Sequence, residues 1–199
     1  MRKATAARKS KETNITISVN LDGTGKTSVK TGMPFLDHML TLLGTHGLFD
    51  LTVKARGDLH IDRHHTNEDI GLVFGQAVDK ALGNRKGITR FGFAYVPMDE
   101  ALARVVLDIS GRPKLVFNDA RGQGRAKLSS STDYAWGDAE HFLESFARTA
   151  KVTLHIDVLA GSDFHHVCEG VFKALGRALE QATRIHPRVK GIPSSKGRL

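Results

Sequence analysis

The chain has 199 residues, of which 40% are apolar and 25% are charged. This composition is typical of a folded globular protein and suffices for one large domain or two small packed halves. No run of 18 apolar residues could span a bilayer, and the first residues lack the apolar segment of a signal peptide. We therefore expect a cytoplasmic protein with no membrane partner. The single cysteine, Cys168, excludes an intrachain disulfide.

The net charge of +8 is partly concentrated at the two ends of the chain. Five basic residues fall within the first eleven positions, and further basic residues follow Arg177. Such a charge fits either an anionic substrate or a nucleic acid. We interpret residues 1–11 as a basic, solvated tail that frays from the fold.

Apolar periodicity predicts the elements of the first part of the chain. Residues 12–21 and 49–55 alternate between apolar and polar side chains, which is the period of a half-buried strand. Pro34 opens a predicted helix that runs to Leu43. A second helical face extends from Asn67 to Leu82, and Gly83 follows as a typical helix end.

The later part of the chain repeats this order of strands and helices. Pro97 and the segment Gly111-Arg112-Pro113 are expected to interrupt its strands. Residues 118–136 are rich in glycine and serine and predict a loop. The predicted strands are residues 91–96, 101–109, 114–116 and 152–158, and the predicted helices are residues 138–150 and 167–182.

Histidines and carboxylates recur in a matched pattern. The stretch from Gly57 to Asp69 contains three histidines directly before a predicted helix, and a reduced version recurs from Asp163 to Glu169. Another histidine precedes each stretch, at His38 and at His141. This shared order predicts an α+β fold with two pseudo-equivalent halves, each an antiparallel sheet packed on two helices. The predicted divisions are a tail (1–11), two half-repeats (12–90 and 91–186) and a C-terminal tail (187–199).

Helix geometry turns these residues into candidate metal ligands. Residues four apart share one face of a helix, so His64 with Glu68, and His165 with Glu169, can each bind one cation. The neighbouring histidines project about 100° away and are free to bind another ion. Imidazole and carboxylate without thiolate suit manganese, iron or zinc, with positions left open for water or substrate. The eight candidate donors are His38, His64, His65, Glu68, His141, His165, His166 and Glu169.

Several blocks, in this order along the chain, resemble the imidazoleglycerol-phosphate dehydratase family. The resemblance extends from about Glu12 to Gly197. The blocks include Phe35-Leu36-Asp37-His38, residues 57–69, Arg90-Phe91-Gly92, residues 108–113, Glu140-His141-Phe142, His165-His166 with Glu169, and residues 192–197.

The resemblance implies a fold of the ribosomal protein S5 domain 2-like type. It also implies a reaction, the removal of water from D-erythro-imidazole-glycerol phosphate to give imidazole-acetol phosphate in histidine biosynthesis. Two Mn²⁺ ions per active site would hold this small phosphorylated imidazole substrate. The resemblance further implies a homo-oligomer of twenty-four subunits, with ligands for each site drawn from more than one subunit.

The resemblance assigns roles to individual residues. Glu169 and Glu12 take the acid/base positions, although Glu169 could be only a metal ligand and Glu12 only a surface charge. The phosphate side has guanidinium, ammonium and hydroxyl donors that suit a dianion. The implied substrate-binding residues are Glu12, His38, His46, His64, His65, Glu68, Arg90, Arg112, His165, Lys173, Ser195 and Lys196.

Two features of the chain depart from the family pattern. Leu42 replaces a polar residue of the family pattern, and residues 118–136 fit that pattern poorly.

A basic nucleic-acid-binding protein with a structural metal would explain the charge, but no aromatic cluster interleaved with arginine or lysine is present to stack bases. A metal-dependent hydrolase lacks a supporting HExxH pattern. We therefore expect a small-molecule substrate and no nucleic-acid partner.

Overall fold

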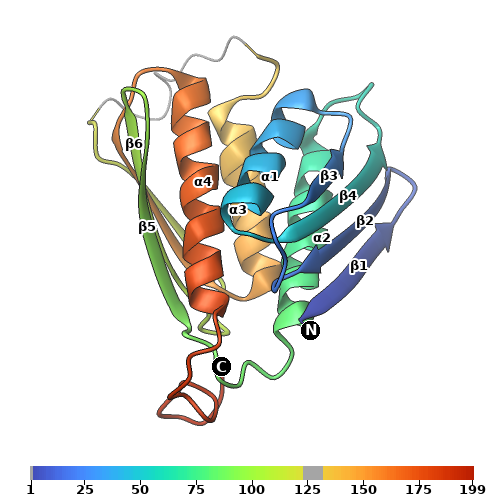
Figure 1. Cartoon of the computed structure of the whole chain (residues 1–199). Coiled ribbons are helices and arrows are strands. Elements are labelled where there is room, and N and C mark those ends of the chain that lie inside the picture. The colour runs from blue at the N-terminus through green and yellow to red at the C-terminus, as the bar shows by residue number, and fades with distance from the viewer. Residues whose placement is uncertain (1, 123–131) are drawn as a thin grey trace.

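Two sheets enclose a layer of helices in the computed structural model, which describes residues 2–122 and 132–199. Figure 1 shows this arrangement, with one sheet on either side of the helices. The strands are β1 (Lys3–Lys9), β2 (Thr13–Asn20), β3 (Thr27–Lys30), β4 (Asp50–Gly57), β5 (Phe91–Met98), β6 (Ala101–Asp108), β7 (Lys114–Asp119) and β8 (Thr153–Ala160). The helices are α1 (Pro34–His46), α2 (His64–Leu82), α3 (Trp136–Ala150) and α4 (Phe164–Thr183).

Both sheets have the same topology, which confirms the duplicated α+β fold. Their strand orders are β1-β2-β4-β3 and β5-β6-β8-β7. The prediction of wholly antiparallel sheets is wrong, because β3 pairs in parallel with β4 and β7 in parallel with β8. In each half a helix connects these two strands, and such a crossover brings the chain back in the same direction.

The helices of one half pack on those of the other. Helix α2 lies against α3, and α1 lies against α4. Glycines permit both close approaches: a Cβ atom on Gly75 of α2 would lie 2.5 Å from the carbonyl oxygen of Phe146, and one on Gly176 of α4 would lie 2.5 Å from that of Leu43. The helix layer is therefore one shared core, with Phe74 of α2 stacked on Phe146 of α3.

Two predicted boundaries shift in a way that matters for the site. Helices α2 and α4 each begin three residues before their predicted starts. The first turn of α2 is polar and shows no apolar period, whereas α4 begins with the buried Phe164, which the predicted range left out. Both histidine pairs consequently lie in the first turn of a helix. The Asp163 carboxylate caps α4 by accepting a hydrogen bond from the N–H of His166.

The prediction that residues 1–11 form a frayed tail is wrong. Residues 3–9 form β1, which pairs with β2 from Lys3 opposite Asn20 to Lys9 opposite Asn14. Ala6 is buried, and most of the basic residues occupy the solvent side of this edge strand. Pro97 does not end β5 either, since an edge strand tolerates a residue without an N–H donor.

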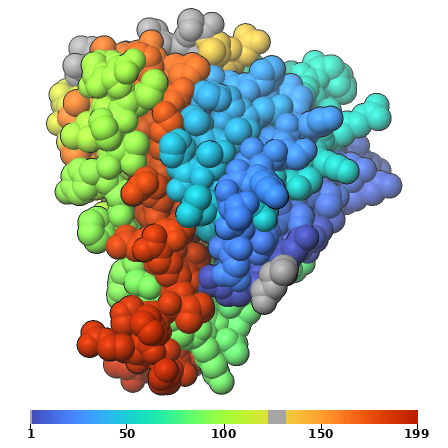
Figure 2. Space-filling model, viewed as in Figure 1, coloured from blue at the N-terminus to red at the C-terminus, as the bar shows by residue number. Residues whose placement is uncertain are grey.

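The predicted loop over residues 118–136 is shorter than expected among the described residues. Asn118 and Asp119 belong to β7, and Trp136 begins α3. Residues 123–131 of that prediction lie outside the described residues. The C-terminal segment, residues 187–199, lies at the end of the molecule where α4 ends, as Figures 1 and 2 show in red. Within the described ranges, no helix is both long and apolar enough to cross a membrane.

Candidate metal centre

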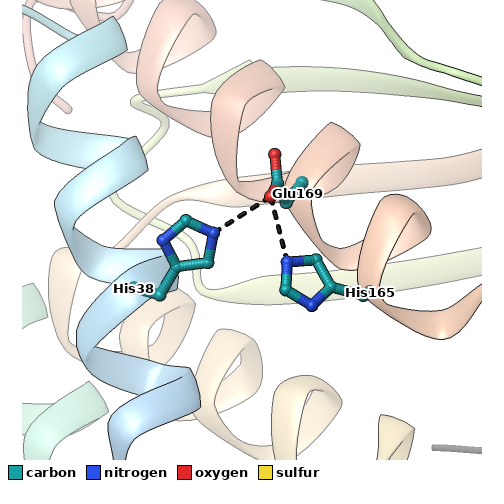
Figure 3. A group of neighbouring side chains, drawn as sticks. All are labelled: His38, His165 and Glu169. Atoms are coloured by element: carbon teal, nitrogen blue, oxygen red, sulfur yellow. Dashed lines mark hydrogen bonds and ion pairs between the residues drawn. The ribbon is translucent and has the colours of Figure 1, made fainter.

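The first candidate group joins α1 to α4. His38 Nε2 and His165 Nε2 each lie 3.0 Å from Glu169 Oε1, and the three side chains point toward one another in Figure 3. His165 and Glu169 are one helical turn apart and so share a face of α4. The three ligand atoms lie within 4.8 Å of one another, which is close enough to bind one cation.

The second candidate group joins α2 to α3. His64, Glu68 and His141 also place one ligand atom each within 4.8 Å of one another. The rings of His64 and His141 stack with their centroids 4.5 Å apart. Arg148 Nη2 donates a hydrogen bond of 3.0 Å to Glu68 Oε1. The chemistry is the same as in the first group: two imidazoles and one carboxylate.

Each group combines residues from both halves of the duplicated fold. His38 of the first half meets the histidine and glutamate of the second half, and His141 of the second half meets those of the first. The sequence pattern indicated the eight donors but not this exchange. The exchange follows from the packing of α1 on α4 and of α2 on α3.

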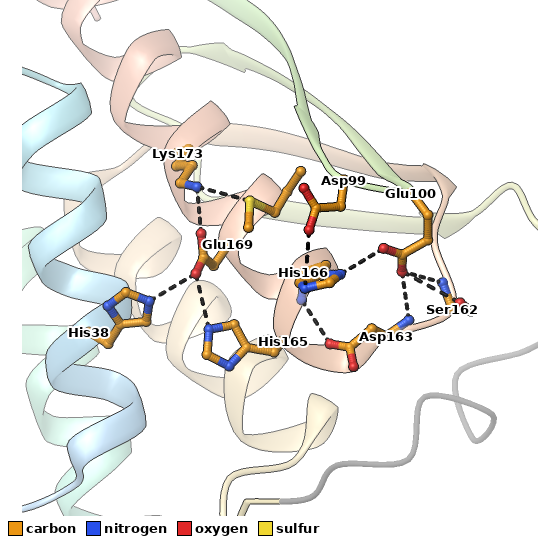
Figure 4. A network of polar contacts seen from close by, with 10 residues as sticks. His38, Asp99, Glu100, Ser162, Asp163, His165, His166, Glu169 and Lys173 are labelled. Carbon is orange, nitrogen blue, oxygen red and sulfur yellow. Dashed lines mark hydrogen bonds and ion pairs between the residues drawn. The ribbon is translucent and has the colours of Figure 1, made fainter.

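His65 and His166 belong to neither group, and each has Nδ1 against a carboxylate. His65 Nδ1 lies 3.0 Å from Asp58 Oδ2, and His166 Nδ1 lies 2.7 Å from Glu100 Oε2 (Figure 4). These hydrogen bonds raise the pKa of both histidines. Sequence reasoning did not identify Asp58 or Glu100 as part of the site.

Glu169 is an ionised carboxylate at neutral pH. Burial raises its pKa, but hydrogen bonds from Lys173, His38 and His165 and the charge of Lys173 outweigh this effect and lower the pKa to about 2. Lys173 Nζ lies 2.5 Å from Glu169 Oε2 (Figure 4). It also donates to the sulfur of Met98. An ionised carboxylate can serve as a metal ligand or as a base.

A cleft of about 1090 Å³ connects the two groups. His38 and His165 of the first group and His64 of the second lie in its wall. Aromatic side chains supply an apolar part, with Phe35 stacked on the buried ring of Tyr134. Such a cleft is large enough for a small molecule that reaches donors of both groups.

Two further predicted residues lie beside these groups. Glu12 is an exposed residue whose Oε2 lies 3.9 Å from His65 Nδ1. His46 lies at the end of α1 facing α4. Burial lowers the pKa of His46, as do the nearby charges of Lys173 and Arg177. The structure therefore brings Glu12 to the histidine pair of the first half.

The remaining phosphate-side residues gather elsewhere. Arg90 forms a two-pronged ion pair with Asp108, at 2.7 and 3.0 Å, and donates to the carbonyl oxygen of Pro193 in the C-terminal segment that carries Ser195 and Lys196. This ion pair raises the pKa of Arg90. Arg112 follows β6 in the turn that contacts the end of the same segment at Leu199. None of these basic residues lines the cleft.

Comparison with known proteins identifies the family. Residues 31–179 match the family model described as imidazoleglycerol-phosphate dehydratase. The chain is 52% identical over 198 residues to the enzyme of that name from Acetivibrio thermocellus, covering 100% of this chain and 99% of the relative. It is 53% identical over 199 residues to the one from Polaromonas sp., covering 100% and 94%.

Two solved structures share the fold. The Staphylococcus aureus imidazoleglycerol-phosphate dehydratase superposes with a TM-score of 0.79 at 37% identity, covering 92% of this chain and 99% of that one. The Pyrococcus furiosus enzyme, solved in complex with (S)-C348, superposes with a TM-score of 0.81 at 36% identity, covering 97% and 99%. The chain belongs to the imidazoleglycerol-phosphate dehydratase family.

Proposed function

We propose that this protein removes water from D-erythro-imidazole-glycerol phosphate to give imidazole-acetol phosphate, a step of histidine biosynthesis in the cytoplasm. One observation carries the proposal: two groups of two histidines and one glutamate open onto a single cleft. Family membership favours this reaction over the nucleic-acid-binding and hydrolase alternatives.

The donor set fits two Mn²⁺ ions per active site. Each group offers two imidazole nitrogens and one carboxylate oxygen but no thiolate, a set that suits manganese, and three protein donors leave positions open for substrate. When bound, the ions would supply Lewis acidity that favours loss of a proton from the imidazole ring of the substrate, and the ionised ring can donate electrons to the neighbouring carbon as its hydroxyl group leaves.

Two carboxylates are the proposed proton carriers. Glu169 is ionised and can accept the proton from the middle carbon of the glycerol chain, which becomes the carbonyl carbon of the product, and Lys173 stabilises its charge before the transfer. Glu12 is exposed beside His65 and can move the second proton, at the departing hydroxyl group. These two steps remove one water molecule and leave an enol, and transfer of the enol proton to the carbon beside the ring then gives the ketone of imidazole-acetol phosphate.

The proposed site needs more than one chain. The backbone N–H of Arg90 donates to the carbonyl oxygen of Ala182 near the end of α4, whereas His165 lies in the first turn of that helix. At a rise of 1.5 Å per residue the two positions are about 25 Å apart. That distance exceeds the length of one imidazole-glycerol phosphate molecule, so Arg90, Arg112, Ser195 and Lys196 would bind the phosphate of a substrate held at another chain's metal groups.

An exposed aromatic face supports the proposed homo-oligomer of twenty-four subunits. Phe91, Phe93 and Tyr95 alternate along the outer face of β5 and are 54 to 60% exposed. The matching strand of the first sheet, β1, has Lys3, Thr5 and Ala7 on its outer face. Exposed aromatic rows of this kind mark surfaces where proteins associate.

An assay of the manganese-loaded protein tests the proposal. Purified protein is expected to convert imidazole-glycerol phosphate to imidazole-acetol phosphate, and the variant His165→Ala is expected to lose this turnover. The matched control is His155→Ala, since His155 is an exposed histidine of β8 outside both groups. Metal-loaded wild-type protein that leaves the substrate unchanged would refute the proposed reaction.

A further inference from the structure

Two glutamates occupy equivalent places in the duplicated fold. Glu12 directly precedes β2 and Glu100 directly precedes β6, each in the turn between the first two strands of its sheet. Each faces the second histidine of the pair in its own half, His65 or His166. The comparison of the two halves therefore assigns Glu100 to the site.

The two positions differ in what the glutamate does. Glu12 Oε2 lies 3.9 Å from His65 Nδ1, because Asp58 takes the hydrogen bond to that nitrogen at 3.0 Å. Glu100 Oε2 makes the corresponding hydrogen bond itself, at 2.7 Å from His166 Nδ1. The Glu12 carboxylate can therefore take another role, whereas the Glu100 carboxylate is hydrogen-bonded to His166.

Backbone hydrogen bonds hold the Glu100 carboxylate in one orientation. Its Oε1 accepts from the N–H of Ser162 at 3.0 Å and from the N–H of Asp163 at 2.9 Å (Figure 4). The other oxygen, Oε2, is left for His166. An ionised carboxylate can only accept, so a neutral His166 must carry its proton on Nδ1 and keep the lone pair on Nε2.

We propose that Glu100 is a positioning residue that holds His166 in the tautomer whose Nε2 can bind a metal ion. Among the described residues, Nε2 of His166 has no hydrogen-bond partner, and the carboxylate of Asp99 lies 3.7 Å away. The inference rests on the proposed function and, beyond its two groups, on the sequence prediction that His166 is a further metal ligand. Carboxylates that fix a ligating histidine through its other nitrogen are common at metal sites.

The substitution Glu100→Gln tests the proposal because the surrounding backbone N–H groups fix the orientation of the glutamine amide. In Glu100→Gln the two backbone N–H groups still require an acceptor, so the amide oxygen takes the place of Oε1 and the NH₂ group faces His166. His166 must then accept at Nδ1 and carry its proton on Nε2. This tautomer cannot bind a metal ion through Nε2.

Binding of Mn²⁺ alone, followed by electron paramagnetic resonance of the free ion, is the first readout. We expect Glu100→Gln to weaken Mn²⁺ binding by about 10- to 100-fold. Glu100→Ala leaves Nδ1 to water and should weaken binding less, although loss of the hydrogen bonds to Ser162 and Asp163 should make it the less stable variant. Glu180→Gln, the same chemical change on an ion pair near the end of α4, should bind as the wild type does.

The second readout is the tautomer itself, by solid-state ¹⁵N NMR of metal-free, ¹⁵N-histidine-labelled protein at pH 9. We expect the proton of His166 on Nδ1 in the wild type and on Nε2 in Glu100→Gln, with the signals assigned by comparison with His166→Gln. The proposal is overturned if Glu100→Gln binds Mn²⁺ as tightly as the wild type. It is also overturned if Mn²⁺ affinity follows thermal stability, with Glu100→Ala the weaker binder, or if wild-type Nδ1 is unprotonated.

These readouts separate this inference from the proposed reaction. Neither Mn²⁺ binding nor the tautomer depends on turnover. Wild-type protein that binds Mn²⁺ but leaves imidazole-glycerol phosphate unchanged would refute the dehydratase proposal alone. An unchanged tautomer in Glu100→Gln, with normal wild-type turnover, would refute the role of Glu100 alone.

Discussion

Neighbouring charged residues set the pKa values of individual carboxyl groups in this protein. Glu169 stays ionised in a partly buried position because Lys173 and two histidines surround its oxygens. Asp119 is a second example, away from the candidate metal groups. Both oxygens of its carboxylate accept from the guanidinium of Arg121 at 2.6 Å, and both side chains are buried. Arg121 also donates to the carbonyl oxygen of Gly161, which joins the end of β7 to the turn before α4.

The Asp119 and Arg121 pair predicts an acid-sensitive part of the stability. Hydrogen bonds from Arg121 lower the pKa of Asp119 below its ordinary value of 3.8. A carboxyl group with a lowered folded-state pKa stabilises the fold above its unfolded-state pKa of about 4 and loses that contribution as the pH falls through the folded-state value. Asp119→Asn should therefore cost about 3 kcal/mol at pH 7, where Arg121 loses a buried partner, and much less at pH 2.

Chemical denaturation at pH 7 and at pH 2 measures this difference. Glu144→Gln, at an exposed position on α3, is the control and should change the free energy of unfolding little at either pH. An equal loss for Asp119→Asn at both pH values would show that the ion pair does not cause the effect.

At the level of elements, glycines set the separation of the helices that carry the candidate metal ligands. A Cβ atom at position 75 would lie 2.2 Å from Thr149 Oγ1 and 2.5 Å from the carbonyl oxygen of Phe146. Contacts that short cannot persist, so α2 and α3 would have to move apart. The second candidate metal group spans these same two helices, and its geometry therefore depends on their packing.

Gly75→Ala is accordingly expected to destabilise the protein by about 1 to 3 kcal/mol. It should also weaken Mn²⁺ binding at the second group, because His141 would move away from His64 and Glu68. Gly137→Ala, a helical glycine of α3 with open space around it, should be neutral or stabilise by up to about 1 kcal/mol. Denaturation and Mn²⁺ titration of both variants check this, and normal Mn²⁺ binding in Gly75→Ala would contradict it.

At the scale of the whole molecule, the distance along α4 between His165 and Arg90 leads us to a prediction about assembly. The first candidate metal group lies at the start of α4 and the basic cluster around Arg90 at its end. If two chains build each site, a chain with His165→Ala and a chain with Arg112→Ala should complement each other when they are co-expressed. Random association would give about one quarter of the sites an intact metal group and an intact Arg112.

Turnover of the co-expressed mixture, compared with each variant expressed alone, measures this complementation. Recovery toward about one quarter of the wild-type rate is the expected result, as random pairing of two chain types gives. A mixture no more active than its parents would show that each site is contained within one chain.

Local patterns were sufficient for most of the fold. Alternation and helical spacing located β2, β4, β8 and the bodies of all four helices, because each period depends only on neighbouring residues and on one buried face. The same geometry paired His64 with Glu68 and His165 with Glu169, since residues one turn apart always share a side of a helix. The order in which the histidines recur was enough to predict the duplication.

Long-range packing decided the rest. Strand β1 was missed because three of its seven residues are basic and its apolar residues are all alanine, and only its pairing with β2 distinguishes an edge strand from a tail. His38 could not be assigned to His165 and Glu169 from spacing, since that contact exists only because α1 packs on α4 across the two halves. Glu100 lies 66 residues from His166 and meets it through a strand turn. Contacts of this kind depend on how the elements pack in space, and no local period of the chain encodes them.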